Sequence, residues 1–374
     1  MRGGPSIMRG ASGCGPAPPS DIGATLMYVP IKGGEQAVAA SRLAVERARR
    51  GDESLADIEI AQIIAQMGLA LDRVMSEGGL YDPRLAAIAF KQAQGDLAEA
   101  IFLLRAHRAR LPDFGLAAPI DLTQLRYQRY ISATQKELAG GQILGATYDY
   151  THRLLDFRLE TTQPRPELEP SVVGADQAFE SPLNDHAELI AQEAAQDPVD
   201  ITRTPLSAKA TPSERLAHLA RGEEGYLTGL AYERLRKAGA AHPYVAELAM
   251  GSVEVVVELE DIGLSVSIGD LPLTICTSLQ PNLGDTPHLQ SGFGIAFGAN
   301  ERKAVAMAVV DQHIKAGQAH ADVLMHCDGV AAAGYVSHLK LPHYSDFDAD
   351  IARLRRIRAQ QAASANREPN QSDS

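Results

Sequence analysis

Two histidines near the C-terminal end of the sequence, His338 and His343, have a spacing that could serve a metal ion. They lie five residues apart in the segment GYVSHLKLPHYSDF. A regular helix or a straight strand would turn the two rings to different sides, but Pro342 provides a bend at which they could converge. Two imidazoles are too few for a structural zinc site and would leave positions open for water, substrate or a partner chain. From the spacing alone, hydrogen bonding on a loop is the simpler interpretation.

A second candidate is the pair of glycines before the first predicted helix. Lys32, Gly33 and Gly34 precede a helix predicted over residues 36–50. Adjacent glycines let backbone N–H groups approach a phosphate, and the N-terminus of a helix favours an anion. Lys32 would add positive charge. An ordinary tight turn accounts for the same residues and is the commoner meaning of the pattern.

The segment GGQILGATYDYTHRLLDF, residues 140–157, combines permissive glycines with a cluster of polar side chains. Asp149 and His152 could act as acid and base on a sugar, with Arg153 as a neighbouring cation. A structural loop with hydrogen-bonded side chains is the alternative. Other basic positions could line an anionic pocket or form a solvated face: Arg126, Arg129, Arg158 and the arginine of DITRTP at 200–205.

Composition limits the class of protein. The chain has 374 residues, of which 45% are hydrophobic and 22% charged, as is usual for a globular protein with a sizeable core. The net charge of −12 argues against nucleic acid as a partner, because phosphate backbones attract basic surfaces. No apolar run is long enough for a membrane span. The three scattered cysteines fit a reducing, cytoplasmic compartment. No P-loop, dinucleotide-binding, serine-hydrolase or iron–sulfur motif is present.

The order of predicted elements indicates an α+β fold, with an N-terminal helical domain before a larger mixed domain that contains a small, mostly antiparallel sheet. The predicted organisation is a leader at 1–26, a helical domain at 27–111, a mixed domain at 112–358 with a flexible insert at 160–199, and a disordered tail at 359–374. Helices are predicted over 36–50, 60–77, 83–94, 97–111, 212–221, 225–237, 301–314 and 346–361. Strands are predicted over 27–31, 253–259, 263–269 and 273–279, the second and third as a hairpin.

Eight segments, in order from about Met27 to about Leu354, resemble the I subunit of the bacterial carbon–phosphorus lyase core complex. They are MYVPIKGGEQAV, LALDRVMSEGGL, EAIFLLRAHR, GGQILGATYDYTHRLLDF, DITRTP, RGEEGYLTGLAY, ERKAVAMAVVD and GYVSHLKLPHYSDF. The resemblance implies a cytoplasmic complex with G, H and J subunits, at whose centre the I subunit dimerises. It also implies a nucleosidase that cleaves the N-glycosidic bond of ATP or GTP. With the G, H and L subunits, methylphosphonate replaces adenine to give α-D-ribose 1-methylphosphonate 5-triphosphate.

Members of this family carry zinc on paired histidines that match His338 and His343. The resemblance says little about which residues cleave the glycosidic bond, so residue type and local clustering suggest the candidates: Asp149 as the negative charge near the anomeric carbon and His152 as the acid near the departing base. Lys32, Arg153 and Lys340 would donate to the triphosphate. The alternative is a non-catalytic scaffold that lends its histidine pair to a site on a partner subunit.

Overall fold

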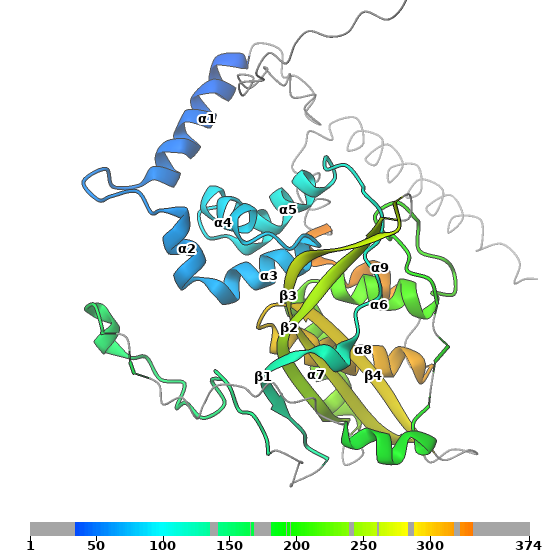
Figure 1. Cartoon of the computed structure of the whole chain (residues 1–374). Helices are drawn as coiled ribbons and strands as arrows, with labels where there is room; N and C mark the ends of the chain where they lie inside the picture. The colour runs from blue at the N-terminus through cyan, green and yellow to red at the C-terminus, as the bar shows by residue number, and fades with distance from the viewer. Residues whose placement is uncertain are drawn as a thin grey trace, which may run out of the picture. The chain divides into compact units, whose positions relative to one another are not determined.

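The computed structural model describes residues 34–134, 141–164, 166–167, 181–191, 193–194, 196–238, 243–259, 262–282, 288–317 and 322–331. Contacts divide the chain into two units, Met1–Asp57 and Ile58–Ser374. The division places the helices of residues 58–111 in the same unit as the sheet (Figure 1). The predicted domain boundary near residue 111 stays a prediction.

The first unit contains one described helix, α1 (Glu35–Arg50), close to its predicted bounds. Glu35 lies in its first turn and Arg47 in its last, which suits the positive and negative ends of the helix dipole. Gly51, with φ of 64°, ends the helix, and its N–H donates to the carbonyl of Arg47. None of the residues of α1 is buried.

The second unit begins with four helices, α2 (Ile60–Gln66), α3 (Gly68–Gly78), α4 (Pro83–Gln92) and α5 (Leu97–Arg108). The predicted caps are confirmed, because the carboxylates of Asp82 and Asp96 accept N–H groups at the starts of α4 and α5. Their common core is apolar and buried, and it includes Leu71, Val74, Ala86, Ile101 and Leu104.

The prediction of one helix across residues 60–77 was wrong. The backbone leaves helical geometry at Met67, with φ of −113° and ψ of 30°, and α3 starts at Gly68. Glycine is a poor helix former, so a break costs least beside it. The apolar spacing runs through the break unchanged, which is why periodicity did not reveal it.

The sheet has four antiparallel strands in the order β1 (Arg126–Ile131), β2 (Tyr244–Leu259), β3 (Leu264–Asn282) and β4 (His288–Phe297). The α+β class and the antiparallel hairpin are confirmed. The strands predicted at 263–269 and 273–279 are one strand, β3. The strand passes Gly269, with φ of 120°, by means of a bulge. It also continues through Pro272, which lies one residue beyond the pairing with β4, so the missing N–H of the proline removes no β3–β4 hydrogen bond.

Strands β1 and β4 were not predicted, and the segment at 140–157 forms no strand in its described part. Ile143 makes only an isolated bridge with Tyr130. Within the segment predicted as an insert, Ile190 forms an isolated bridge with Leu289 of β4. In the part of the chain that the structure describes, the short 3-10 helices are η1 (Leu122–Gln124), η2 (Phe157–Glu160) and η4 (Pro182–Leu189).

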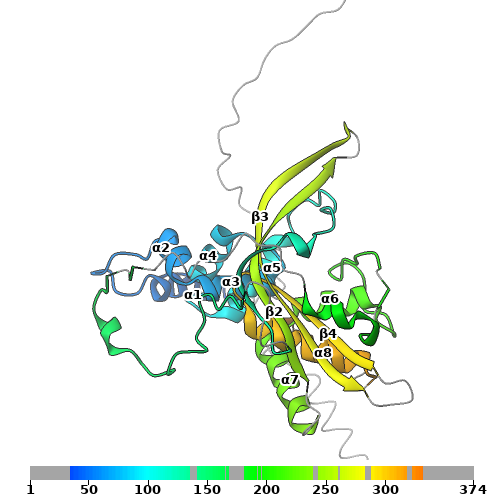
Figure 2. The same cartoon turned by 60° about the horizontal axis from the view of Figure 1, so that its bottom comes forward.

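Helix α8 (Glu301–Lys315) lies against β4 and β3, with α7 (Glu224–Ala238) packed beside it (Figure 2). Gly292 and Gly294 permit this close approach, because a Cβ on either would lie 1.9 Å from a carbonyl oxygen of α8. Asn300 precedes α8 as predicted, but its side chain makes no capping hydrogen bond. None of the helices in the described ranges is long and apolar enough to cross a membrane.

The remaining helices are α6 (Pro212–Arg221) and α9 (Asp322–His326). The capping box predicted for α6 is confirmed: Thr211 and Glu214 each accept the other's backbone N–H. The helix predicted at 346–361 and the strand predicted at 27–31 lie outside the described residues.

Candidate functional site

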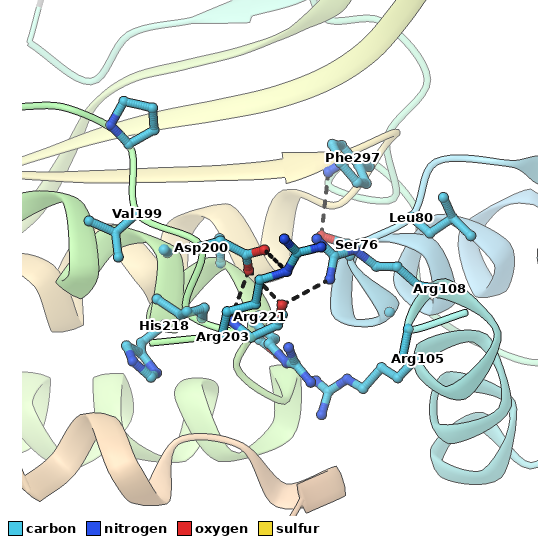
Figure 3. Close-up of a pocket in the computed structure, with 18 of the residues that line it drawn as sticks. Ser76, Leu80, Arg105, Arg108, Val199, Asp200, Arg203, His218, Arg221 and Phe297 are labelled. Carbon is cyan, nitrogen blue, oxygen red and sulfur yellow. Dashed lines mark hydrogen bonds and ion pairs between the residues drawn. The ribbon is translucent and has the colours of Figure 1, made fainter. Parts of the chain in front are cut away.

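A cleft of about 1130 Å³ lies in the second unit, between the helices, the middle of β3 and the end of β4 (Figure 3). Its walls come from the end of α3, from α5 and the loop after it, from residues 198–203, from α6, and from apolar residues of the sheet. Segments that are far apart in the sequence therefore meet here. The helices and loops contribute arginines as well as apolar residues, whereas the sheet contributes only apolar ones.

One side of the cleft carries four arginines, Arg105, Arg108, Arg203 and Arg221. Arg105 and Arg108 are three residues apart near the end of α5 and therefore share one helix face. Arg221 is the last residue of α6, and Arg203 follows Asp200 in the connecting segment. Figure 3 shows these side chains gathered around Asp200.

The four arginines differ in how firmly the protein holds them. The Arg105 guanidinium is fully engaged: it is 2.5 Å from Asp328 and donates to the carbonyl oxygens of Glu77 and Arg221, each at 2.9 Å. Arg108 has a contact of 3.5 Å to the hydroxyl of Thr202, and no carboxylate of the described residues lies within ion-pair distance of it. Arg108 is thus available to an incoming anion, whereas Arg105 acts as a fixed support.

Arg203 and Arg221 complete the cationic side. Arg203 is 66% exposed and lies 3.2 Å from Asp113 and 3.5 Å from Asp200, so its ion pairs are solvated and exchangeable. Burial, together with the charge of Arg105, lowers the pKa of Arg221. A site in which cations lie this close together favours an anion that neutralises them.

The sheet side of the cleft is apolar. It is formed by Leu80 of the helical region and by side chains on or near the sheet: Ile120, Leu271, Leu273, Ile295 and Phe297. The ring of Phe297 is held edge-on to Tyr81, with centroids 5.8 Å apart. A cleft with guanidinium groups on one side and an apolar wall on the other suits a ligand with a phosphate end and a flat apolar end, such as a purine nucleotide.

A buried ionic network lies directly beside the cleft. Glu77 of α3 and Lys303 of α8 are both 0% exposed. The Lys303 ammonium donates to the carbonyl of Gly222 at 2.7 Å, and one carboxylate oxygen of Glu77 accepts from Arg73 and from the N–H of Glu224. Burial raises the pKa of Glu77 and lowers the pKa of Lys303 to about 8. The network ties α3, the α6–α7 turn and α8 together behind the cationic side.

Lys303 gives a prediction for alkaline stability. Its folded pKa of about 8 lies below the ordinary 10.5, so between these values the unfolded chain binds a proton that the folded chain does not. Its contribution to the free energy of unfolding therefore increases as pH rises through this range, by about 3 kcal/mol in total. Denaturant titrations of wild type and Lys303→Met at pH 7.5, 9 and 10 should show this difference growing. A difference that stays flat across this range would contradict the prediction.

The predicted residues Asp149, His152 and Arg153 are described but do not line the cleft. The carboxylate of Asp149 lies 2.8 Å from the guanidinium of Arg129 and 3.7 Å from that of Arg153. The side chain of Arg129 is only 1% exposed. Arg129 also lies 2.6 Å from Glu301, so it is a buried structural cation and not part of a solvated face. The ring of His152 is exposed and makes no hydrogen bond or ion pair to another described residue. The structure brings Asp149 and Arg153 together but does not bring His152 to them.

The remaining predicted residues are only partly covered. Gly34 is the residue before α1, and Lys32, Gly33, His338, Lys340 and His343 lie outside the described residues. Within the described ranges, no group of three or more His, Cys, Asp or Glu side chains is arranged to hold a metal ion. The zinc pair and the Lys32 phosphate loop stay predictions.

Sequence reasoning missed most of the cationic side. The arginine of DITRTP, Arg203, was considered for anion contact, but Arg105, Arg108 and Arg221 were not. The available signal was the pair of basic residues at a three-residue spacing at the end of α5. Basic residues in the last turn of a helix are common because they suit its dipole, so this signal alone does not indicate a ligand.

Comparison with known proteins now adds to this geometry. A model of the bacterial phosphonate metabolism protein family, PhnI, matches residues 27–361. The chain is 44% identical to the α-D-ribose 1-methylphosphonate 5-triphosphate synthase subunit PhnI of Escherichia coli K12, over 90% of this chain and 99% of that one. It is 43% identical to the protein of the same name from Rhizobium meliloti 1021, over 90% and 96% of the two chains. It is 37% identical to the putative C-P lyase subunit protein HtxH of Stutzerimonas stutzeri, over 88% and 95%. The chain belongs to the PhnI family of bacterial phosphonate metabolism proteins.

Proposed function

We propose that this chain is the nucleosidase subunit of a carbon–phosphorus lyase core complex and acts on purine nucleoside triphosphates in phosphonate catabolism. Alone it cleaves the N-glycosidic bond of ATP or GTP. With the G, H and L subunits it replaces adenine by methylphosphonate at the anomeric carbon, giving α-D-ribose 1-methylphosphonate 5-triphosphate. Family membership and the names of the relatives support the pathway and the synthase role.

The observation that carries the nucleotide assignment is the two-sided cleft. A triphosphate placed along Arg108, Arg203 and Arg221 would meet guanidinium groups whose planar donors match phosphate oxygens. The purine would then lie toward Phe297 and the apolar side chains of β3 and β4. Arg105, fixed by Asp328 and two carbonyls, would hold the cationic side in shape without giving up its own hydrogen bonds.

The chemistry requires the bond between the anomeric carbon and the base nitrogen to break with both electrons leaving on the base, which takes up a proton. Water, or methylphosphonate in the complex, then attacks the oxocarbenium-like carbon. Negative charge near that carbon stabilises it. Hydrogen bonds from Thr202 lower the pKa of Asp200, so this carboxylate remains ionised in the cleft. Asp149, predicted for the same role, lies outside the cleft lining.

The proposal includes a zinc ion on His338 and His343, with its open positions facing the J subunit or a substrate. It also includes a cytoplasmic complex with G, H and J subunits and self-association as a dimer. The names of the relatives as synthase and C-P lyase subunits support membership of a multi-subunit assembly. The second candidate function is a scaffold without catalysis, which is compatible with these names because they describe a subunit of the synthase.

Release of free base separates the two functions. The purified chain is incubated with ATP or GTP, and adenine or guanine is measured by chromatography beside Asp149→Asn and the double variant His338→Ala/His343→Ala. We expect release by the wild type. Loss in a folded histidine variant would tie the metal pair to this chemistry, and unchanged release by Asp149→Asn would remove that residue from it. No release by the wild type, alone or with the G, H and L subunits, would favour the scaffold.

A further inference from the structure

The hairpin formed by β2 and β3 extends beyond the body of its unit as an arm, defined here as residues 253–259 and 262–270 (Figure 2). Its two strands pair with each other through Val257 and Val266 and through Leu259 and Leu264. Strands β1 and β4 pair with the lower part of the hairpin and do not reach these residues. Within the described residues, no other strand pairs with the arm, although the N–H of Ala118 donates to the carbonyl of Val256 at 2.8 Å. The outer part of the arm, from Val257 to Val266, is therefore a two-stranded ribbon.

One face of the arm is apolar, whereas the other is mixed and carries Val256 together with polar side chains. Successive side chains of a strand alternate between faces, and directly paired residues share one. Val257, Leu259, Leu264 and Val266 therefore form one face, while Glu258 and Ser265 belong to the other. Leu259, Leu264 and Val266 are 42%, 55% and 42% exposed, and Ile262 and Ile268 at the turn and the bulge are 63% and 65% exposed. An isolated two-stranded ribbon gains nothing from an exposed apolar face, and such a face promotes aggregation unless something covers it.

The charge of the arm indicates what could cover it. Residues 253–270 contain five acidic side chains, Glu254, Glu258, Glu260, Asp261 and Asp270, and no lysine or arginine. The whole chain carries a net charge of −12. A second copy of this chain would bring like charge to the arm, whereas a surface rimmed by lysine and arginine would be attracted to it. Charge complementarity therefore favours a different protein over self-association at this surface.

We propose that the apolar face of the arm is a docking surface for a different protein subunit, one that presents an apolar groove rimmed by lysine and arginine. Leu264, Val266 and Leu259 would fill the groove, and Glu254 and Glu258, which extend from the opposite face of the narrow ribbon, would meet its rim. Asp270 is already paired with Arg126 of this chain, at 2.5 Å. Relatives of this chain bear the names of subunits, which supplies the setting in which such a partner exists. The inference does not depend on the nucleosidase assignment, because a scaffold subunit would need the same contact.

The first test compares variants on the two faces of the arm. The full chain is co-expressed with the other core-complex subunits as wild type, as Leu264→Ser/Val266→Ser and as Ser265→Ala/Ser267→Ala, and assembly is followed by size-exclusion chromatography and titration of purified components. We expect association to weaken at least tenfold in the first variant only. Both pairs are exposed, so thermal unfolding of the isolated chain should stay unchanged. Equal association of all three proteins would overturn the proposal.

A second measurement identifies the occupant. A photo-crosslinking phenylalanine analogue is placed at position 266 or, as the matched control, at position 265, and the linked peptide is found by mass spectrometry in the assembled complex. We expect a link from position 266 to another subunit, beside lysine or arginine residues, and little from position 265. A link to a second copy, or to this chain's own arginine-bearing segment at 351–358, would overturn it. Base release by the same preparations reports separately on the nucleosidase proposal.

Discussion

Replacing Arg108 and Arg203 together by glutamine is expected to weaken ATP binding at least about 100-fold. Each side chain can offer charge-assisted hydrogen bonds to a phosphate, and a hydrogen bond to a charged group contributes about 1.5–3 kcal/mol. Two such losses amount to about 3–6 kcal/mol, and about 1.4 kcal/mol corresponds to a factor of ten. Isothermal titration with a non-hydrolysed ATP analogue measures the effect directly, and base release at low ATP concentration should fall in parallel.

The matched control is Arg110→Gln, which removes an exposed arginine two residues beyond Arg108 that does not line the cleft. It changes the net charge in the same direction without touching the proposed site, so binding should change by less than about threefold. Neither Arg108 nor Arg203 is buried, and thermal unfolding should therefore be unaffected. Equal binding by the double variant and the wild type would mean that the cleft does not hold the phosphates.

Replacing Gly294 by alanine should destabilise the protein by about 3 kcal/mol or more. A Cβ at this position would lie 1.9 Å from the carbonyl oxygen of Ala304 and 2.9 Å from the backbone nitrogen of Ala308, so β4 and α8 must move apart. Overpacking of a core commonly costs about 1–3 kcal/mol, and here no flexible side chain can yield because the neighbours are backbone atoms. Chemical denaturation followed by circular dichroism measures the loss.

The control for this variant has the opposite expected sign. Gly229 lies within α7 and is exposed, and a Cβ added there would have no neighbour within 4 Å. Alanine at this position should stabilise the helix by about 0.5–1 kcal/mol, because glycine loses more backbone freedom on folding. If both substitutions changed stability by similar small amounts, the close contact between β4 and α8 would be contradicted.

Local signals predicted helix boundaries well wherever a side chain caps the backbone. The Thr211–Glu214 box and the Asp82 and Asp96 caps each depend on residues within one turn, so the sequence contains the whole interaction. The Met67 break and the continuity of β3 past Pro272 depend instead on packing and on where a neighbouring strand ends. Both features depend on the tertiary structure, so the spacing of apolar residues in the sequence does not reveal them.

The sequence predicted even less of the candidate site than of the fold. Arg105, Arg203 and Arg221 are about 100 and 20 residues apart in sequence, and each has an ordinary local explanation as a helix-end or loop cation. Arg129 resembled a solvated residue and is almost completely buried against Asp149 and Glu301. Only the folded chain shows which arginines are available to a ligand and which are structural. The eight resembling segments, by contrast, gave the family correctly because their order along the chain is itself information.

The single strand β3 has a mechanical consequence. Its first residues form the outer part of the arm, and Leu271 and Leu273, a few positions further along, belong to the apolar wall of the cleft. A displacement of the arm is therefore transmitted along the paired strands β2 and β3 to the apolar wall of the cleft. The bulge near Gly269 is the position at which the ribbon bends most easily. If binding of a partner to the arm changes the shape of the wall and so the affinity for nucleotide, then nucleotide in the cleft must change the affinity for the partner by the same free energy. Assembly of the complex and occupancy of the cleft would then be coupled through the stiffness of one strand.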